Sequence, residues 1–134
     1  MKQSHFLYLG LLDLLLVGGL AAVFGLGVFV RSPIVLVTIA GICAVLAGTV
    51  AAVSFGPVTL SWRHLVGVSY VTFALVWPAT YAPEVVAGSA SEQDLLLFVV
   101  TTVGALSLAV YGVDVARGGR HFSVSADVER VVGW

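Results

Sequence analysis

IVLVTIAGICAVLAGTVAAVSF, residues 34–55, is the stretch that decides the fold, and it contains no charged residue. A helix needs about 20 apolar residues to cross the hydrocarbon core of a bilayer, and this run supplies them. Pro33 precedes the run and Gly56-Pro57 follows it, so both of its ends carry residues that start or stop helices. The sequence therefore predicts a membrane-spanning helix over residues 34–55.

Small residues recur at every fourth position of this stretch. They are Ala40, Ala44, Gly48 and Ala52. Positions four apart share one face of a helix, and small side chains on that face let another backbone approach closely in lipid. Ala21 and Gly25 form a similar step in the preceding run, and we expect them to meet this ridge. The pattern predicts a compact bundle with residues 34–55 at or near its centre.

The composition points to lipid as the surrounding solvent. The chain has 134 residues, of which 60% are hydrophobic and 10% are charged. Soluble domains carry about 25% charged residues, so a soluble fold of this size could not bury so much apolar surface. The formal net charge of -1 leaves no basic face for nucleic acid. We expect the lipid bilayer as a partner, together with further copies of the chain or other membrane proteins.

Four apolar runs are long enough to span a membrane. They cover residues of about 6–30, 34–55, 61–81 and 95–116. The first run is longer than the apolar core of a secretory signal peptide, about 7–15 residues, so we interpret it as a retained helix. The prediction is an all-α integral membrane four-helix bundle, up-down-up-down with short connectors. Residues 1–116 form the transmembrane domain, and residues 117–134 form a cytoplasmic tail.

The connectors and the tail carry their own signals. Ser91, with Asp94 three residues later, is typical of a capping box that starts a helix after the loop over residues 82–94. In the tail, Val128, Val131 and Val132 have helical spacing. A short interfacial helix anchored by Trp134 is one interpretation of the tail, and a frayed segment is the other.

The distribution of basic residues predicts the orientation. With four spans, both chain ends lie on the same side as the connector after residue 55, and basic residues gather on the cytoplasmic side of membrane proteins. That side carries Lys2, Arg63, Arg117, Arg120 and Arg130, and the opposite side carries Arg31. We therefore expect a multi-pass protein of the cell membrane with both termini in the cytoplasm.

Asp13 is the sharpest functional signal. An ionisable residue inside a span is costly and usually has a partner or a function, so Asp13 is a candidate proton or cation site. Its expected partners lie on the same side of the membrane: Arg63, His64 and Tyr111, with Arg117 beyond them. A second interpretation places Asp13 near the headgroups, hydrogen-bonded to a neighbour. Asp114 is expected to pair locally with Arg117.

Motifs for catalysis and for cofactors are missing from the sequence. It contains no glycine-rich phosphate loop, no recognisable catalytic triad and no zinc-ligand spacing. The single Cys43 supplies neither an internal disulfide nor a metal motif, and is interpreted as a packing residue. We expect a protein that is not an enzyme and carries no metal or cofactor.

Two functions follow as hypotheses. The first is a non-enzymatic packing or assembly subunit, or an oligomerising membrane module, favoured by the small-residue ridges. The second is a small proton- or cation-coupled transporter that uses Asp13. Four short helices with one acidic residue in the first, after the run Tyr8-Leu9-Gly10, resemble the layout of the small multidrug exporters. The similarity is limited to that layout and that run, so the sequence is not assigned to the family.

Overall fold

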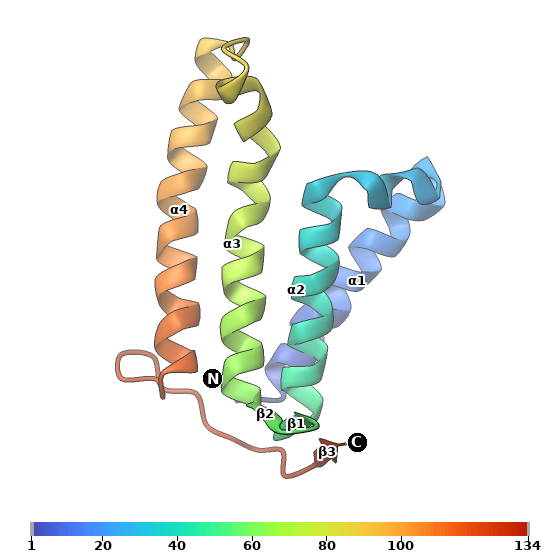
Figure 1. Ribbon diagram of the computed structural model, residues 1–134, viewed down its shortest axis with the longest axis vertical. Coiled ribbons are helices and arrows are strands. Elements are labelled where there is room, and N and C mark those ends of the chain that lie inside the picture. Colours follow the sequence, from blue (N-terminus) through green and yellow to red (C-terminus); the bar gives the residue numbers. More distant parts are fainter. Residues whose placement is uncertain (1, 134) are drawn as a thin grey trace.

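The computed structural model describes residues 2–133, and for Phe55 it describes the backbone alone. Within that range the fold is mostly helical (Figure 1). The long helices are α1 (His5–Phe24), α2 (Ser32–Thr49), α3 (Trp62–Val86) and α4 (Glu92–Ala116). Each of them is long and apolar enough to cross a membrane. The prediction of a helical fold built on four apolar helices is confirmed.

The helices form a row in which each packs against the next one in the chain: α1 on α2, α2 on α3, and α3 on α4 (Figure 1). α3 and α4 have 25 residues each, against 20 in α1 and 18 in α2. The α3–α4 hairpin therefore extends past the connector between α1 and α2. We call the end of the row that carries the connector between α3 and α4 the distal end. The opposite end, where both chain termini lie, is the proximal end. α2 and α3 together form the middle of the row, so the predicted central position of residues 34–55 is shared with α3.

The first predicted span, residues 6–30, is wrong beyond Phe24. Gly25 adopts φ +79°, a left-handed conformation that ends α1, and Leu26–Val30 continue as the short 3-10 helix η1. A Cβ atom on Gly25 would meet nothing within 4 Å. Gly25 is therefore a helix terminator, and the expected contact of the Ala21–Gly25 step with the ridge on α2 does not form at this glycine.

The second predicted span, residues 34–55, is wrong at its far end. α2 begins with Pro33 in its first turn, as expected, but it stops at Thr49. Residues Ala52–Phe55 form strand β1, which pairs antiparallel with β2 (Val58–Ser61). Gly56 supplies the positive φ of 57° that the turn between them requires. Ala52 consequently lies in a strand and is not part of the helical ridge.

The third and fourth helices are longer than predicted, so the loop between them is shorter. α3 starts at Trp62 and continues through Pro83 to Val86, where the sequence predicted an end near residue 81. α4 starts at Glu92, three residues before the predicted start of the span. The predicted capping box is confirmed: the Ser91 hydroxyl accepts from the Asp94 backbone, and the Asp94 carboxylate accepts from the Ser91 backbone.

The tail is neither a helix nor a frayed segment within residues 117–133. Val131–Gly133 form strand β3, which pairs in parallel with β1 to give a sheet of order β2-β1-β3. The free edge of β1 offers unpaired backbone groups, and these bind an extended segment more readily than a helix. The interfacial helix predicted from the valine spacing is therefore wrong, and Trp134 lies outside the described residues.

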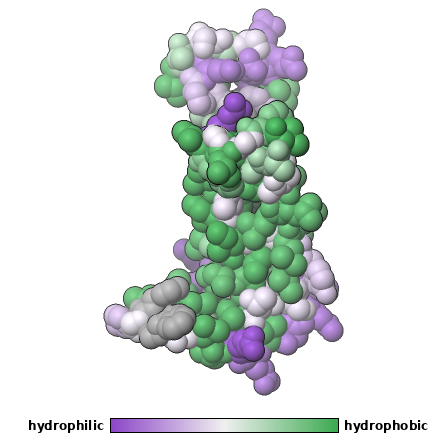
Figure 2. All heavy atoms as spheres, turned by 90° about the vertical axis from the view of Figure 1, so that its right-hand side faces the viewer, coloured by the Kyte–Doolittle hydropathy of each residue, from purple (hydrophilic) through white to green (hydrophobic). Residues whose placement is uncertain are grey.

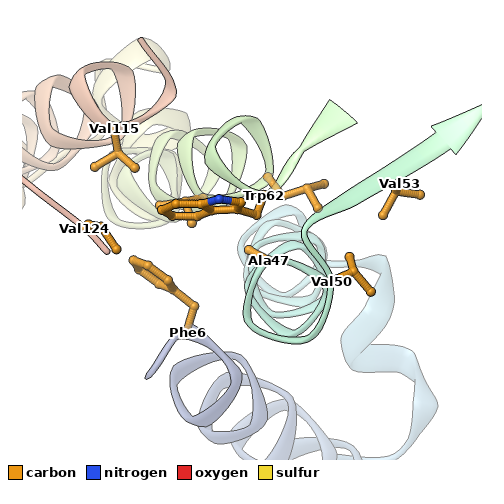
Figure 3. Close-up of a cluster of buried hydrophobic side chains, with 9 residues drawn as sticks. Phe6, Ala47, Val50, Val53, Trp62, Val115 and Val124 are labelled. Atoms are coloured by element: carbon orange, nitrogen blue, oxygen red, sulfur yellow. The ribbon is translucent and has the colours of Figure 1, made fainter. Parts of the chain in front are cut away.

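The larger hydrophobic core lies at the proximal end. Trp62 sits at its centre, where Phe6 from α1 and Val124 from the tail meet the ends of α2 and α4 (Figure 3). Its buried members are Phe6, Ala47, Val50, Val53, Trp62, Leu65, Val66, Val115 and Val124. Because this core takes side chains from both chain ends, the tail is an integral part of the fold.

Glycines and alanines mark the closest helix contacts. A Cβ atom on Gly48 would clash with the backbone nitrogen of Leu7, so α1 and α2 touch there backbone to backbone. Ala40 is buried on the side of α2 that faces α3, where its carbonyl accepts from the Ser69 hydroxyl at 2.9 Å. Ala44 is also buried. The predicted ridge of Ala40, Ala44 and Gly48 therefore lies against two neighbouring helices, with Gly48 next to α1 and Ala40 next to α3.

Candidate functional site

A cavity of about 130 Å³ lies where all four helices contribute a wall. Most of its lining is apolar, but three polar side chains belong to it: Asp13 of α1 with Ser69 and Tyr70 of α3. The full lining is Phe6, Leu9, Asp13, Ala44, Ser69, Tyr70, Phe73 and Leu108. An apolar cavity with a few convergent polar groups is the usual form of a small-molecule or ion site.

Asp13 lies near the middle of α1. It is the ninth residue of that helix, roughly 12 Å along the axis from the first residue at 1.5 Å per residue. Gly41 of α2 faces it, and a Cβ atom on this glycine would come within 3.1 Å of the Asp13 Cβ. The glycine lets the two backbones approach at this level. The Asp13 side chain is partly exposed, because the cavity is partly open.

The expected partners on α3 do not reach Asp13. The His64 Nδ1 atom lies 2.8 Å from the Ser61 hydroxyl, and the Arg63 guanidinium lies over the Trp62 ring at 4.9 Å. Among residues 2–133, no hydrogen bond or ion pair joins the Asp13 carboxylate to another group. The predicted pairing of Asp13 with Arg63 or His64 is therefore wrong, and Arg63 and His64 belong to the proximal end of α3.

Tyrosines connect the cavity to the tail. The ring centroids of Tyr70 and Tyr111 are 4.7 Å apart, and those of Tyr111 and Phe122 are also 4.7 Å apart. Tyr70 lines the cavity together with Asp13. Tyr111, a predicted site residue, thus packs against Tyr70 and does not itself line the cavity. Sequence reasoning missed Tyr70 as a site residue, although its place in the most polar of the four runs was a usable signal.

The polar lining suits a proton or a hard cation. The lining includes Asp13, Ser69 and Tyr70, whose side chains carry a carboxylate and two hydroxyl groups, and oxygen ligands favour hard cations. The Ser69 hydroxyl donates its hydrogen to the Ala40 carbonyl, so its lone pairs remain available to a cation. No group of three or more His, Cys, Asp or Glu side chains within residues 2–133 could hold a metal ion.

The tail and the N-terminal segment close the proximal end of the row. The buried Gln3 side chain donates to the carbonyls of Ala47 and Val50, each at 2.9 Å, and its backbone N–H donates to Ser125. These bonds satisfy two carbonyl groups at the end of α2 that the helix itself leaves free. Phe6 lines the cavity and also belongs to the core that contains Val124 of the tail. The tail therefore helps to hold one wall of the cavity in place.

The predicted local pair of Asp114 with Arg117 is wrong. The Asp114 carboxylate instead binds the tail, accepting from the backbone N–H groups of His121 and Phe122 at 3.1 and 3.0 Å. Its other oxygen lies 3.0 Å from the His121 Nδ1 atom. These three contacts hold the Asp114 carboxylate in a fixed geometry. They are more favourable than an ion pair with the flexible, exposed side chain of Arg117.

We expect docking of the tail to depend on pH through Asp127. The Ser4 hydroxyl and then the Ser4 backbone N–H, at 2.6 and 2.9 Å, donate to Asp127 and hold the pKa of its carboxyl below the usual range. A lowered pKa means that docking is fully stabilised above about pH 3.9, the ordinary value for aspartate. That stabilisation is lost as the pH falls through the lowered pKa.

The measurement is the NMR shift of the Ser4 amide against pH in detergent micelles. Asp127→Asn is expected to remove the transition, whereas Glu129→Gln, which neutralises an exposed carboxylate nearby in the tail, is expected to keep it. A Ser4 amide shift that does not change with pH in the unmodified chain would contradict this account of docking.

Comparison with protein families gives a match over most of the chain. No curated protein and no solved structure matches the chain. Residues 1–128 match a family of unknown function, DUF7994, so the match includes all four helices and most of the tail. The chain therefore belongs to the DUF7994 family of unknown function.

Proposed function

We propose that this chain is an integral membrane protein with four spans and both termini in the cytoplasm. A broad hydrophobic surface lies between polar ends in Figure 2, as expected for a band of lipid contact. The proximal end carries five of the six basic side chains, which favours its cytoplasmic location. Arg31 lies in the connector between η1 and α2, at the opposite end of those helices.

Within the membrane, we propose that the protein is a non-enzymatic assembly module that associates with a second copy of itself. The observation that carries this proposal is the partly exposed Asp13 carboxylate near the middle of α1, without a hydrogen bond among residues 2–133. A charged or unpaired carboxylate is costly at this depth in lipid. A second protomer placed over the cavity would cover it.

The outer helices leave room for such a partner. Within the described chain α4 buries Gly112 and Val115 alone, and its other residues remain partly or fully accessible. Leu9 and Leu108 border the cavity from α1 and α4, which are the two ends of the row. Association through this side would bring the two Asp13 carboxylates toward each other, where they would share a proton or a cation.

Cross-linking tests the proposed interface. In a Cys43→Ala background, Leu9→Cys is expected to form a disulfide-linked dimer in membranes treated with a mild oxidant, because Leu9 borders the cavity. Leu15→Cys is the matched control: Leu15 is exposed on the same helix, about 200° around the axis from Asp13. Light scattering in mild detergent should give twice the 13.9 kDa mass of one chain. A monomer in detergent and in membranes would remove the proposal.

A second candidate function is proton- or cation-coupled transport through Asp13. The specific observation in its favour is the convergence of Asp13, Ser69 and Tyr70 on one cavity. A carboxylate flanked by hydroxyl groups can bind a proton or a cation reversibly, which is what coupling requires.

Asp13→Asn is expected to abolish coupled flux, because the amide keeps the shape of the side chain but cannot carry the proton or the charge. The measurement is proton flux into proteoliposomes, followed with a pH-sensitive dye. Glu129→Gln removes one negative charge from the exposed tail and is expected to leave the flux unchanged. Equal flux in the Asp13 variant and the unmodified protein would exclude transport through this residue.

A further inference from the structure

A groove of about 670 Å³ follows α4 near the proximal end of the molecule. Its wall is apolar and its floor is polar or aromatic. The wall consists of Leu106, Ala109, Val110 and Val113, and the floor consists of Asp114, Arg117, His121 and Phe122. The wall residues follow helical spacing, so they form a continuous apolar strip that leads down to a charged floor.

Apart from Asp114, which belongs to α4, the floor is a shelf formed by residues 117–122. After α4 the chain first turns outward, away from α3, before it passes back beneath the helices (Figure 1). Asp114 fixes the shelf through its bonds to the backbone of His121 and Phe122 and its contact with the His121 ring. The shelf therefore projects from the side of α4 in a defined geometry.

The charge of the shelf is available to a ligand. Arg117 and Arg120 are exposed, and neither forms an ion pair within residues 2–133. The Asp114 side chain is 12% exposed and its carboxylate is already occupied by the shelf, whereas the His121 side chain is 79% exposed. A ligand that reaches the shelf from the groove thus meets cationic and hydrogen-bonding groups.

We propose that this groove binds a phospholipid with an anionic headgroup. One acyl chain lies along the apolar wall of α4, and the phosphate lies on the shelf between Arg117 and His121. This inference rests on the proposed membrane location, which puts the shelf at the cytoplasmic surface, where anionic lipids attract basic residues close to a span. The groove matches such a lipid in two ways. Its apolar strip suits an acyl chain, and the exposed arginines of the shelf suit an anionic headgroup.

Native mass spectrometry of the full chain tests the proposal. The delipidated protein in neutral detergent is titrated with dioleoyl phosphatidylglycerol or with dioleoyl phosphatidylcholine. We expect the first bound phosphatidylglycerol to bind at least about fivefold more tightly, the gain expected from one basic residue at an anionic surface. Soluble glycerol phosphate is expected not to displace it, because it lacks the acyl chain.

Variants locate the site. Arg117→Gln is expected to weaken the binding of phosphatidylglycerol about fivefold, and Arg117→Lys is expected to retain it. Arg130→Gln removes an exposed arginine of the tail that does not line the groove, and it is expected to leave binding unchanged. Equal affinity for the two lipids, displacement by glycerol phosphate, or equal losses in the Arg117 and Arg130 variants would overturn the proposal.

Two separate measurements distinguish failure of this inference from failure of the proposed function. Extraction of membranes at alkaline pH reports whether the chain is integral, and cross-linking through Leu9→Cys reports self-association. A chain that stays in the membrane and dimerises but binds both lipids equally contradicts the lipid site alone. A chain released by the alkaline wash contradicts the membrane location on which both proposals depend.

Discussion

Gly48→Ala is expected to destabilise the protein by about 3 kcal/mol, the upper end of the usual cost of overpacking a tight contact. The added Cβ atom would clash with the backbone nitrogen of Leu7 and would lie 2.8 Å from its Cα. A backbone cannot rotate away as a side chain can, so α1 must move off α2. The gain of about 1 kcal/mol from replacing glycine by alanine inside a helix does not offset this cost.

Gly104→Ala is the matched control, because a Cβ atom there would meet nothing within 4 Å. The same substitution in α4 is expected to be neutral or stabilising by about 0.5–1 kcal/mol. The measurement is unfolding in mixed micelles as the fraction of denaturing detergent rises, followed by circular dichroism. Equal unfolding midpoints for the two variants would contradict the close contact between α1 and α2.

Gln3→Ala is expected to cost about 2–4 kcal/mol, because it leaves two buried carbonyl groups without their donor. Gln3 is fully buried, and its amide donates to both Ala47 and Val50 at the end of α2. The Oε1 atom of Gln3 is buried without a hydrogen-bond partner among residues 2–133. Removing this unsatisfied acceptor is favourable, so it offsets part of the decrease in the free energy of unfolding. The same unfolding assay measures the change.

The control for this prediction is Ser123→Ala, a substitution at an exposed position of the tail. It is expected to change the free energy of unfolding by less than about 0.5 kcal/mol. Hydrogen exchange of the amides in Val131–Gly133 provides a second readout, since loss of Gln3 should also loosen the docked tail. If the Gln3 and Ser123 variants are equally stable, the amide of Gln3 does not hold the end of α2.

The helices were predictable because hydropathy and capping signals are local. Four long apolar runs separated by polar or proline-containing connectors were enough to predict four helices, and Ser91 with Asp94 marked the start of the last one. The boundaries were less accurate because hydropathy reports the surroundings of a residue and not its backbone conformation. Residues 50–55 are as apolar as the helix before them, yet the turn at Gly56 lets Ala52–Phe55 pair with Val58–Ser61 as a hairpin.

The candidate site was predictable in part for a similar reason. A carboxylate inside an apolar run is visible in the sequence, so Asp13 could be identified. Its neighbours depend on how α1 is set against α3, which no local pattern encodes. Ser69 and Tyr70 line the cavity with Asp13, while Arg63 and His64 lie one to two turns earlier on α3 and interact elsewhere. The tail was misjudged because its binding partner, the edge of β1, was itself predicted to be helical.

The junction of residues 2–4 with residues 124–133 sets an order of events during biosynthesis. The four hydrophobic segments leave the ribosome first and can enter the bilayer one after another. Gln3 and Ser4 must meanwhile wait for Ser125 and Asp127, which are translated more than a hundred codons later. This junction therefore cannot close until residues 125–127 have been synthesised, which makes its closure a late step. A change that breaks these contacts would hinder that late step, even in a chain whose helices had inserted correctly.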